Sequence, residues 1–536
     1  MKILKKILSR FTLVSLAIII QLAWLFYVVF RLSAYYFPIA FIFSCVSIVA
    51  CIFIINRPGN PLVKLAWVVP IMASPLFGGI LYLISGGKGP KKKMRRALEA
   101  SEKHLEPLQA GNAQSGEIAH IDAGGAVPEQ SEADGQAIGA VPADYQVGGC
   151  NIAGQCRYLE QYGFPLYKNT NANYYADCTE GWKRMLEDLE QAERFIFLEY
   201  FIIRPGTMWD AVLEILTRKA AAGVDVRLLY DDFGCVSSLP RKYPEEMAKR
   251  GIRCVAFNRY RPVYSVIMNH RDHRKILVTD RGVGYTGGAN LSDEYINLWE
   301  RFGNWKDNFV RLEGEAVRSM TLLFLRMWYA VCPADMQEDA SAFLPDPAAM
   351  AKIRCPGYVQ PYGDSPMDNE ILAENVYLNI INQATRYVWI CSPYIIVDYE
   401  MTRALCLAAR RGVDVRLLAP AIPDKKVVFE LTKSHFPELI ESGVQVYQYT
   451  PGFVHSKSFV ADDRLAVVGT INMDYRSLTL HFENACLFVD HPMIQDVKAD
   501  FEKTFPISEK VSLSQKKQGF FSRFWLGILR LFAPLM

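Results

Sequence analysis

The first 98 residues contain no aspartate or glutamate, although they include thirteen lysines and arginines. The segment from 510 to 536 also lacks acidic residues and contains five basic ones. The middle of the chain, from 99 to 509, therefore holds all 56 acidic residues against 41 basic ones, a net charge of −15. This charge argues against a nucleic-acid-binding protein, because phosphate backbones are bound mainly through Lys and Arg. The basic ends instead indicate a membrane.

Patterns typical of metal sites are also absent. The twelve cysteines include no CxxC pair, which argues against a zinc site. We expect free thiols in a reducing compartment. The motifs described below contain no carboxylate cluster at metal-ligand spacing. We therefore predict no metal and no cofactor.

Long apolar runs occur near the N-terminus. Residues 11–30 and 34–55 are each long enough to span roughly 30 Å of hydrocarbon as a helix, and two such runs do not fit a cleaved signal peptide. A third run, 65–84, is broken by prolines and glycines, so it either spans or re-enters. Basic residues precede the first run and follow the third at 88–96, and such clusters prefer the cytoplasm. We therefore expect an even number of crossings, and two crossings plus a bent or interfacial third segment satisfy this condition.

Composition divides the rest of the chain. Residues 106–148 are rich in Ala, Gly, Gln and Glu without apolar periodicity, which is typical of a flexible tether. The C-terminal segment has apolar residues interrupted by arginines, and it either packs on the protein or lies in the membrane interface. The predicted parts are a membrane-anchoring region (1–98), a flexible linker (99–157), two lobes (158–345 and 346–510) and an amphipathic end (511–536).

An internal repeat defines the two lobes. The heptapeptide GVDVRLL occurs at 223–229 and again at 412–418. Each copy follows an apolar strand pattern, at 195–203 and 387–396, and a helix-length stretch that ends in Gly. Strand, helix and strand in this order form a parallel βαβ unit. The sequence thus predicts an α/β fold of two similar lobes, each a mixed sheet flanked by helices, related by pseudo-twofold symmetry.

A second repeat carries the chemistry. Two HxKxxxxD motifs are each followed by glycine and asparagine at matching offsets, and an acidic residue precedes an Asn in the next strand pattern of each copy. The first copy comprises His273, Lys275, Asp280, Gly288, Asn290 and Asp307, and the second comprises His455, Lys457, Asp462, Thr470, Asn472 and Glu483. One copy is a moderate signal, whereas two copies inside matching βαβ repeats are a strong one.

Paired histidines suit transfer of a phosphoryl-type group. One imidazole can attack phosphorus while the other protonates the departing oxygen and then deprotonates the incoming alcohol or water. The lysines and the asparagine amides can bind the non-bridging phosphate oxygens, and the glycines allow close approach of the backbone. Either Asp280 and Asp462, or Asp307 and Glu483, would hold the second nitrogen of a histidine ring. Both alternatives stay open at this level. We predict catalytic roles for the His, Lys and Asp of both motifs. The residues predicted to contact substrate are Gly288, Asn290, Asp307, Thr470, Asn472 and Glu483.

These motifs, with their trailing GGxN and GTxN, resemble the phospholipase D superfamily. The stretches FNRYRP, NHRDHRK, GGANLSDEY, PYGDSP, GFVHSK and NMDYRS are similar to signatures of its membrane-bound bacterial members. The resemblance implies transfer of a phosphatidyl group from one phosphatidylglycerol to a hydroxyl of another, giving cardiolipin and glycerol through a phosphohistidine. It also implies that His273 is the nucleophile and His455 the acid and base.

The same resemblance implies where the protein is located and which molecules it contacts. We expect a multi-pass protein of the bacterial plasma membrane with the lobes on the cytoplasmic side, acting on phosphatidylglycerol and other anionic phospholipids in the bilayer, without nucleic acid. No pattern defines an oligomeric state. The alternatives are a phospholipase D that uses water, a synthase that uses another head group or phosphatidylethanolamine, a nuclease, and a non-catalytic member. We expect His270 and His481, which lie near the motifs, to be structural.

Overall fold

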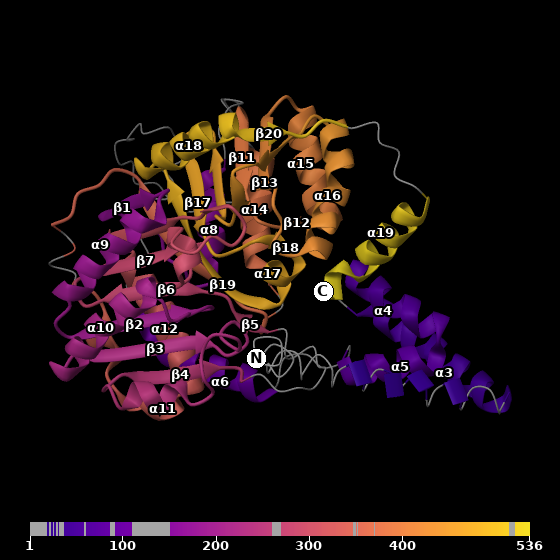
Figure 1. The fold of residues 1–536 in the computed structure, drawn as a ribbon, viewed down its shortest axis with the longest axis horizontal. Coiled ribbons are helices and arrows are strands. Elements are labelled where there is room, and N and C mark those ends of the chain that lie inside the picture. Colours follow the sequence, from indigo (N-terminus) through magenta and orange to yellow (C-terminus); the bar gives the residue numbers. More distant parts are fainter. Residues whose placement is uncertain are drawn as a thin grey trace, which may run out of the picture.

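The computed structural model contains two α/β lobes side by side, with a group of helices projecting to one side (Figure 1). It describes residues 19–20, 23–24, 26–27, 30–31, 37–57, 61–85, 92–109, 151–259, 270–346, 350, 352–368, 370–513 and 520–535. Most of the first predicted apolar run, 11–30, and the part of the predicted linker from 110 to 150 lie outside the described residues.

The first lobe is built on a mixed sheet that, within the described residues, has seven strands in the order β1-β9-β7-β6-β2-β3-β4. The strands are β1 (Thr170–Tyr175), β2 (Phe195–Tyr200), β3 (Asp225–Asp231), β4 (Arg253–Phe257), β6 (Lys275–Thr279), β7 (Val283–Gly287) and β9 (Phe309–Gly314). Strands β2, β3 and β4 are parallel to one another, and β6, β7, β9 and β1 continue the sheet in antiparallel pairs. The helices of this lobe are α9 (Cys178–Gln191), α10 (Thr207–Ala221) and α11 (Tyr243–Ala248).

The second lobe repeats this order. Its main sheet runs β10-β19-β17-β16-β11-β13-β14-β20, so each position has a counterpart in the first lobe and β20 is an addition. The strands are β10 (Tyr358–Asp364), β11 (Tyr387–Cys391), β13 (Asp414–Pro420), β14 (Gln445–Tyr449), β16 (Ser458–Ala461), β17 (Leu465–Gly469), β19 (His481–Val489) and β20 (Ser508–Lys510). The helices are α14 (Leu372–Gln383), α15 (Tyr399–Arg410), α16 (Lys426–Glu441), α17 (Tyr475–Thr479) and α18 (Met493–Thr504). A short parallel pair, β12 (Ile395–Ile396) and β18 (Met473–Asp474), lies beside this sheet.

The repeated heptapeptide forms the strand that follows the βαβ helix in both lobes. Its aspartate begins β3 in one lobe and β13 in the other, and each strand pairs in parallel with the preceding apolar strand. Gly223 and Gly412 both have φ of +92°, a left-handed conformation that favours glycine after a helix end. The predicted mixed α/β lobes are therefore confirmed.

The two lobes share a hydrophobic core. Helix α12 (Val317–Val331) has twelve buried residues and contacts β6 of the first lobe and β10 of the second. The largest apolar cluster includes Phe324 of this helix together with side chains from both sheets, such as Phe197 and Tyr362. A continuous apolar core makes free rotation of one lobe against the other costly, and this fixes the geometry of a site built between them.

The predicted flexible linker, 99–157, is helical where the structure describes it. Helix α6 (Lys92–Gln109) continues the basic cluster and lies along α12, where Ser101 Oγ donates to Arg326 O at 2.8 Å and Arg326 binds Glu102 at 2.8 Å. Helix α8 (Ile152–Gln161) begins before the predicted start of the first lobe and is bound by Gln360 of the second lobe. Helices therefore occupy both described ends of this range, and the predicted division of the chain into domains stays a prediction.

The N-terminal helices form the projecting arm in Figure 1. Helix α3 (Phe37–Asn56) corresponds to the second apolar run, and the third run is divided into α4 (Pro61–Ala73) and α5 (Pro75–Ser85). At about 1.5 Å per residue, α4 with 13 residues and α5 with 11 are each shorter than the roughly 30 Å of a hydrocarbon core. Among the described residues, no helix has both the length and the apolar character required to cross a bilayer.

The C-terminal helix α19 (Phe520–Phe532) packs with one face and exposes the other. Leu529 and Ala533 form an apolar cluster with Leu431 of α16, and Leu62 of α4 packs against it. Arg530 Nε donates to Ser434 Oγ at 2.9 Å. On the other face, the Phe521 side chain is 84% exposed. Packing on the protein is therefore observed for one face of this segment, and a position of the other face in the membrane interface stays a prediction.

Candidate active site

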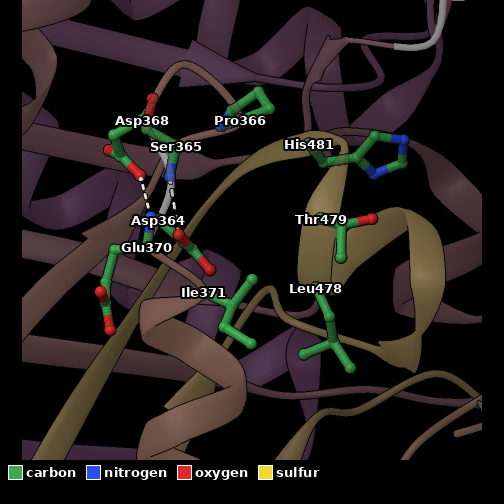
Figure 2. Close-up of a pocket in the computed structure, with 9 residues that line it drawn as sticks. All are labelled: Asp364, Ser365, Pro366, Asp368, Glu370, Ile371, Leu478, Thr479 and His481. Carbon is green, nitrogen blue, oxygen red and sulfur yellow. Dashed lines mark hydrogen bonds between the residues drawn. The ribbon is translucent and has the colours of Figure 1, made fainter. Parts of the chain in front are cut away.

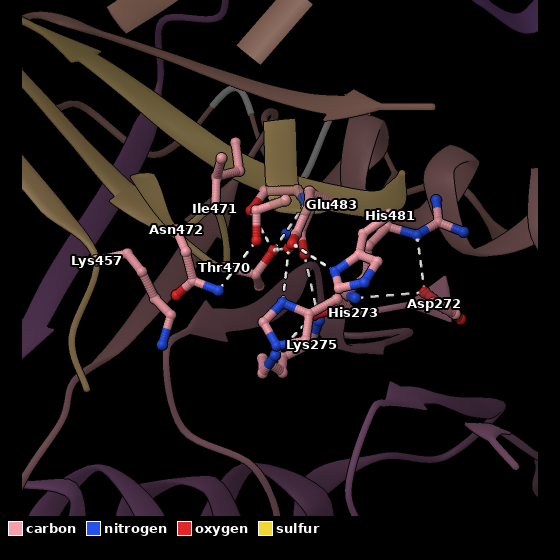
Figure 3. A network of polar contacts seen from close by, with 12 residues as sticks. Asp272, His273, Lys275, Lys457, Thr470, Ile471, Asn472, His481 and Glu483 are labelled. Carbon is pink, nitrogen blue, oxygen red and sulfur yellow. Dashed lines mark hydrogen bonds and ion pairs between the residues drawn. The ribbon is translucent and has the colours of Figure 1, made fainter. Parts of the chain in front are cut away.

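The histidine of the first motif lies where a strand of one lobe pairs with a strand of the other. The two-residue strand β5 (Arg271–Asp272) runs parallel to the start of β19, and the His273 backbone N–H donates to Phe482 O at 2.9 Å. His273 Nδ1 lies 2.9 Å from Glu483 Oε2 (Figure 3). The carboxylate partner of the first-lobe histidine therefore comes from the second lobe.

The second motif has the reciprocal arrangement. Strand β15 (Gly452–Val454) runs parallel to β8 (Asn304–Lys306) of the first lobe, and the His455 N–H donates to Lys306 O at 2.7 Å. His455 Nδ1 lies 2.6 Å from Asp307 Oδ2. Each lobe thus supplies one histidine and the acid that holds the histidine of the other lobe. The second alternative of the sequence analysis, Asp307 and Glu483, is the one observed.

Burial controls the protonation of these pairs. Desolvation lowers the pKa of His273 to about 3 and that of His455 to about 4, although the acids oppose the shift. The facing histidines, in turn, hold the pKa of Asp307 and of Glu483 below their usual values despite burial. At neutral pH the rings are neutral and donate Nδ1–H to the carboxylates, which leaves each Nε2 as the basic nitrogen.

The two motif lysines are buried beside the histidines. Lys275 Nζ donates to His273 O at 2.7 Å. Lys457 Nζ donates to His455 O and lies 2.9 Å from His455 Nδ1. Burial lowers the pKa of Lys275 to about 7 and that of Lys457 to about 8, and Lys457 further lowers that of Lys275. An anion between them would favour the charged forms of both lysines.

Thr470 and Gly288, predicted to contact substrate, instead support the acids. Thr470 Oγ1 donates to Glu483 Oε2 at 2.5 Å. Gly288 occupies the same offset in the first motif, and a Cβ there would lie 2.0 Å from Asp307 Oδ1 and 3.0 Å from His455 O. A side chain at this position would displace the acid that holds His455. Asp307 and Glu483 likewise bind the histidines, and their predicted contact with substrate stays a prediction.

The motif asparagines bind neighbouring groups of their own lobes. Asn290 Oδ1 accepts from the Ile202 N–H at 3.0 Å, and its amide nitrogen donates to Tyr295 Oη at 2.7 Å. The amide nitrogen of Asn472 donates to Ser477 Oγ at 3.0 Å. In this state both amides hold segments next to the histidines, which differs from the predicted contact with phosphate.

The motif aspartates lie away from the histidines. A strand rises about 3.3 Å per residue, and β6 separates Lys275 from Asp280 by its full length. Asp280 accepts from the Glu193 N–H at 3.0 Å, next to the start of β2. Asp462 accepts from the backbone N–H groups of residues 385, 386 and 387 at 2.7 to 2.9 Å, next to β11. Both therefore stabilise the fold, and their predicted catalytic role is not supported by any contact with the histidines.

Several neighbours of the site were missed or undervalued by the sequence analysis. His481, expected to be structural, has its ring centroid 5.5 Å from that of His273. Phe201 lies 4.9 Å from the His273 ring, and Trp305 lies 5.4 Å from the His455 ring. The position of His481 two residues before Glu483 on one strand was an available signal, because such residues share a face. Nothing in the sequence marked the aromatic residues.

Asn308 and Asn484 follow the two acids in sequence, and both form hydrogen bonds to residues in or next to the first motif. Asn308 Oδ1 accepts from the Gly288 N–H at 3.1 Å, within the first lobe. Asn484 Oδ1 accepts from the Lys275 N–H at 3.2 Å, and its amide nitrogen donates to Thr286 Oγ1 at 2.8 Å. Asn484 thereby holds the first motif from the second lobe. The acid-asparagine pairs noticed in the sequence are therefore structural parts of the composite site.

The fold and the paired histidine–lysine motifs define a phospholipase D-like protein. The solved phosphatidylserine synthase of Haemophilus influenzae Rd KW20 has this fold, with a TM-score of 0.53 and 15% identity over 71% of this chain and 98% of that chain. A family model described as cardiolipin synthase, PLD-like domain, matches residues 185–328 and 377–505, and a phospholipase D-nuclease N-terminal model matches 42–87.

Similar proteins of known name identify the family within this superfamily. The cardiolipin synthase of Halalkalibacterium halodurans is 32% identical over 509 residues, which cover 93% of this chain and 94% of that protein. The cardiolipin synthase of Geobacillus thermodenitrificans is 39% identical over 362 residues, covering 67% of this chain and 70% of that protein. The chain belongs to the cardiolipin synthase family.

Proposed function

We propose that this protein transfers a phosphatidyl group from one phosphatidylglycerol to a hydroxyl of a second, giving cardiolipin and glycerol. The observation that carries the proposal is the reciprocal pairing of His273 with Glu483 and of His455 with Asp307. It supplies two neutral imidazoles with defined tautomers, one for attack and one for proton transfer, beside two buried lysines. Family membership supports the lipid substrate.

In the first step, His273 Nε2 attacks the phosphorus of the donor lipid. A bond forms between nitrogen and phosphorus, and the bond between phosphorus and the glycerol oxygen breaks. His455 in its protonated form gives its proton to that oxygen, and glycerol leaves. The low pKa of His455 applies to the site without lipid, and a phosphodiester anion beside the ring would raise this pKa and favour the protonated form.

In the second step, His455, now neutral, accepts the proton of a hydroxyl on the head group of a second phosphatidylglycerol. The alcohol oxygen attacks phosphorus, the bond to His273 breaks, and cardiolipin forms. The second step reverses the first: His455 acts as a base where it acted as an acid, and the bond between His273 and phosphorus breaks where it formed. This reversal fits a reaction in which the leaving group and the attacking group are both glycerol hydroxyls. Lys275 and Lys457 bind the non-bridging oxygens, whose charge grows in each transition state.

The N-terminal helices suit a lipid environment. On α3, the large apolar side chains Phe41 and Val49 are 66% and 67% exposed, and contiguous exposed apolar surface is unfavourable in water. We propose that α3 and its neighbours are embedded in the bacterial plasma membrane as a multi-pass anchor. The basic clusters at both ends of this region favour a cytoplasmic position for the lobes.

The direct test is to incubate the detergent-solubilised protein with phosphatidylglycerol alone and identify the products by mass spectrometry. Cardiolipin and glycerol in equal amounts are expected, and the His273→Ala variant serves as the matched control for contaminating activity. Phosphatidic acid as the main product would indicate hydrolysis instead. Adding phosphatidylethanolamine tests the other alternative, because a mixed product formed in preference to cardiolipin would reassign the acceptor.

A further inference from the structure

Figure 2 shows a small pocket that His481 lines. The ring of His481 lies 5.5 Å from that of His273. It lies between the end of β10, the loop that leads to α14, and the turn from α17 into β19, and its volume is about 80 Å³. The described residues that line it are Asp364, Ser365, Pro366, Asp368, Glu370, Ile371, Leu478, Thr479 and His481. Three of these carry carboxyl groups and none is Lys or Arg, so no cation of the lining opposes the entry of a metal ion. Burial raises the pKa of Asp364 to about 8, so this one of the three carboxyl groups is neutral at pH 7.

His481 connects this pocket with the catalytic pair. The residue is 9% exposed, and neither ring nitrogen has a hydrogen-bond partner among the described residues. Its Nδ1 lies 3.6 Å from Glu483 Oε1, a carboxylate oxygen that likewise lacks a hydrogen bond within the described part of the chain. Unpaired buried polar atoms are costly, and two of them facing each other beyond hydrogen-bond distance indicate a position suited to a shared ligand.

The geometry of these atoms fits a metal ion. His273, His481 and Glu483 each offer one ligand atom, and the three atoms lie within 4.8 Å of one another. Zinc binds nitrogen and carboxylate oxygen at about 2.0 to 2.2 Å in a tetrahedron, which separates neighbouring ligand atoms by roughly 3.4 Å. The 3.6 Å between His481 Nδ1 and Glu483 Oε1 is close to this separation. Two imidazoles and one carboxylate favour Zn²⁺ over Mg²⁺, which prefers oxygen ligands.

We infer that His273, His481 and Glu483 form an inhibitory site for a divalent transition-metal ion such as Zn²⁺, which enters through the acidic pocket. The bound ion takes the Glu483 carboxylate and Nδ1 of His273, whose proton moves to Nε2, so the histidine loses both its orientation and the free electron pair of Nε2. Water completes the coordination. Catalysis needs no metal, and the metal switches it off.

The inhibitory consequence rests on the proposed function, whereas the binding site does not. Binding is therefore measured first, on the full-length protein in detergent after removal of metal with EDTA and dialysis. Zn²⁺ is titrated in competition with a chromophoric chelator. The His481→Phe variant removes the ligand and keeps a ring of similar size, and His104→Phe, at an exposed position on α6 outside the pocket, is the matched control. His481→Gln is the second variant should the first fail to fold.

Wild type and His104→Phe should each bind one zinc ion. In the His481 variants the affinity for this ion should fall at least about tenfold or binding should be lost. Mg²⁺ should not compete with Zn²⁺ for the site. The second measurement is cardiolipin formation as a function of free Zn²⁺, with each variant compared with its own metal-free rate. The concentration for half-inhibition should rise at least about tenfold in the His481 variants.

The two measurements separate the two proposals. Equal zinc binding by wild type and the His481 variants would overturn the metal site, whatever the lipid products are. Loss of a zinc ion in the His481 variants, in a protein that makes no cardiolipin, would retain the metal site and reject the proposed function. Zinc binding that depends on His481 without inhibition would overturn the inhibitory role.

Discussion

Glu483 of the second lobe accepts the Nδ1 hydrogen of His273 of the first lobe, with 2.9 Å between the two heavy atoms. The same relationship joins Asp307 and His455 in the opposite direction. Neither lobe alone therefore contains a motif histidine together with the carboxylate that accepts its Nδ1 hydrogen. Each lobe has its own sheet and helices, so the sequence repeat accounts for the two similar lobes. The exchange of acids makes both lobes necessary for a complete pair of histidine and carboxylate.

Removing the charge of either exchanged acid, Asp307 or Glu483, should lower kcat. Glu483→Gln and Asp307→Asn keep the shape but remove the charge that fixes the tautomer and stabilises the protonated ring, so kcat should fall roughly 10²- to 10⁴-fold. The measurement is the initial rate of cardiolipin formation at saturating phosphatidylglycerol. Asp280→Asn is the control, because Asp280 binds only backbone near β2; it should lower thermal stability and leave kcat within a few-fold. A larger kcat loss in Asp280→Asn than in Glu483→Gln would contradict the assignment.

The buried lysines predict the alkaline side of the pH profile. Burial lowers the pKa of Lys275 to about 7 and that of Lys457 to about 8, and only the protonated forms attract phosphate. The value of kcat/KM, which reports the free enzyme, should therefore fall as pH rises through about 7 to 8. His273 must be neutral to attack, and its pKa of about 3 places the acidic limb far lower. His455 must be protonated in the first step, so its pKa of about 4 in the lipid-free site adds a decline of kcat/KM above pH 4, which steepens where the lysines titrate.

Lys275→Arg provides the check on this prediction, because a guanidinium does not lose its proton in this range. Its absolute activity should be lower, since the shape differs, but the alkaline limb should shift to higher pH. An unchanged limb in this variant would assign the titration to Lys457 alone. A flat wild-type profile from pH 6 to 9 would contradict the lowered pKa values of both lysines.

Gly288 should tolerate no side chain. In Gly288→Ala the new methyl group would meet Asp307 Oδ1 at 2.0 Å and the His455 carbonyl at 3.0 Å, so the acid has to move away from His455. We expect activity to fall at least about 10²-fold with a far-UV circular dichroism spectrum like that of wild type. Gly79→Ala is the control, because a Cβ there meets nothing within 4 Å. Full activity in Gly288→Ala would mean that the Asp307 contact is dispensable.

Chelators should not abolish activity. The proposed steps use imidazole and ammonium groups only, so EDTA should leave the rate of cardiolipin formation unchanged or raise it by removing inhibitory metal. The measurement is the rate before and after EDTA in detergent micelles, with calcium-saturated EDTA as the control for effects on lipid packing. Loss of activity that one added divalent ion restores would contradict the metal-free mechanism.

The βαβ units could be predicted because their signals are local. The repeated GVDVRLL, the apolar strand before it and the closing Gly223 and Gly412 each act within about thirty residues of one another, and propensity and periodicity operate at that range. The structure confirmed this part. The extent of α6 was missed, because a basic run was interpreted only as a signal for membrane topology and not as the start of a helix that packs on α12.

The sequence identified the histidines of the site, but it only partly predicted which acid binds which histidine. His273 and His455 were identified, and the acids that hold them were one of two alternatives. The exchange of acids between lobes depends on the pairing of β5 with β19 and of β15 with β8, which are contacts between segments far apart in sequence. Asp280 looked equivalent to Glu483 in the sequence, and only the length of β6 moves it away from the ring.

The central claim is that the two histidines divide covalent attack and proton transfer between them. The most direct measurement uses a phosphatidyl ester with a nitrophenol leaving group, which departs without a proton, and traps radiolabelled lipid on the protein by rapid acid-free denaturation. His455→Ala should accumulate a labelled adduct, because His273 still attacks and nothing activates the incoming alcohol. His273→Ala should form none. An adduct on His273→Ala with none on His455→Ala would reverse the roles, and no adduct on wild type or either variant would contradict a covalent mechanism.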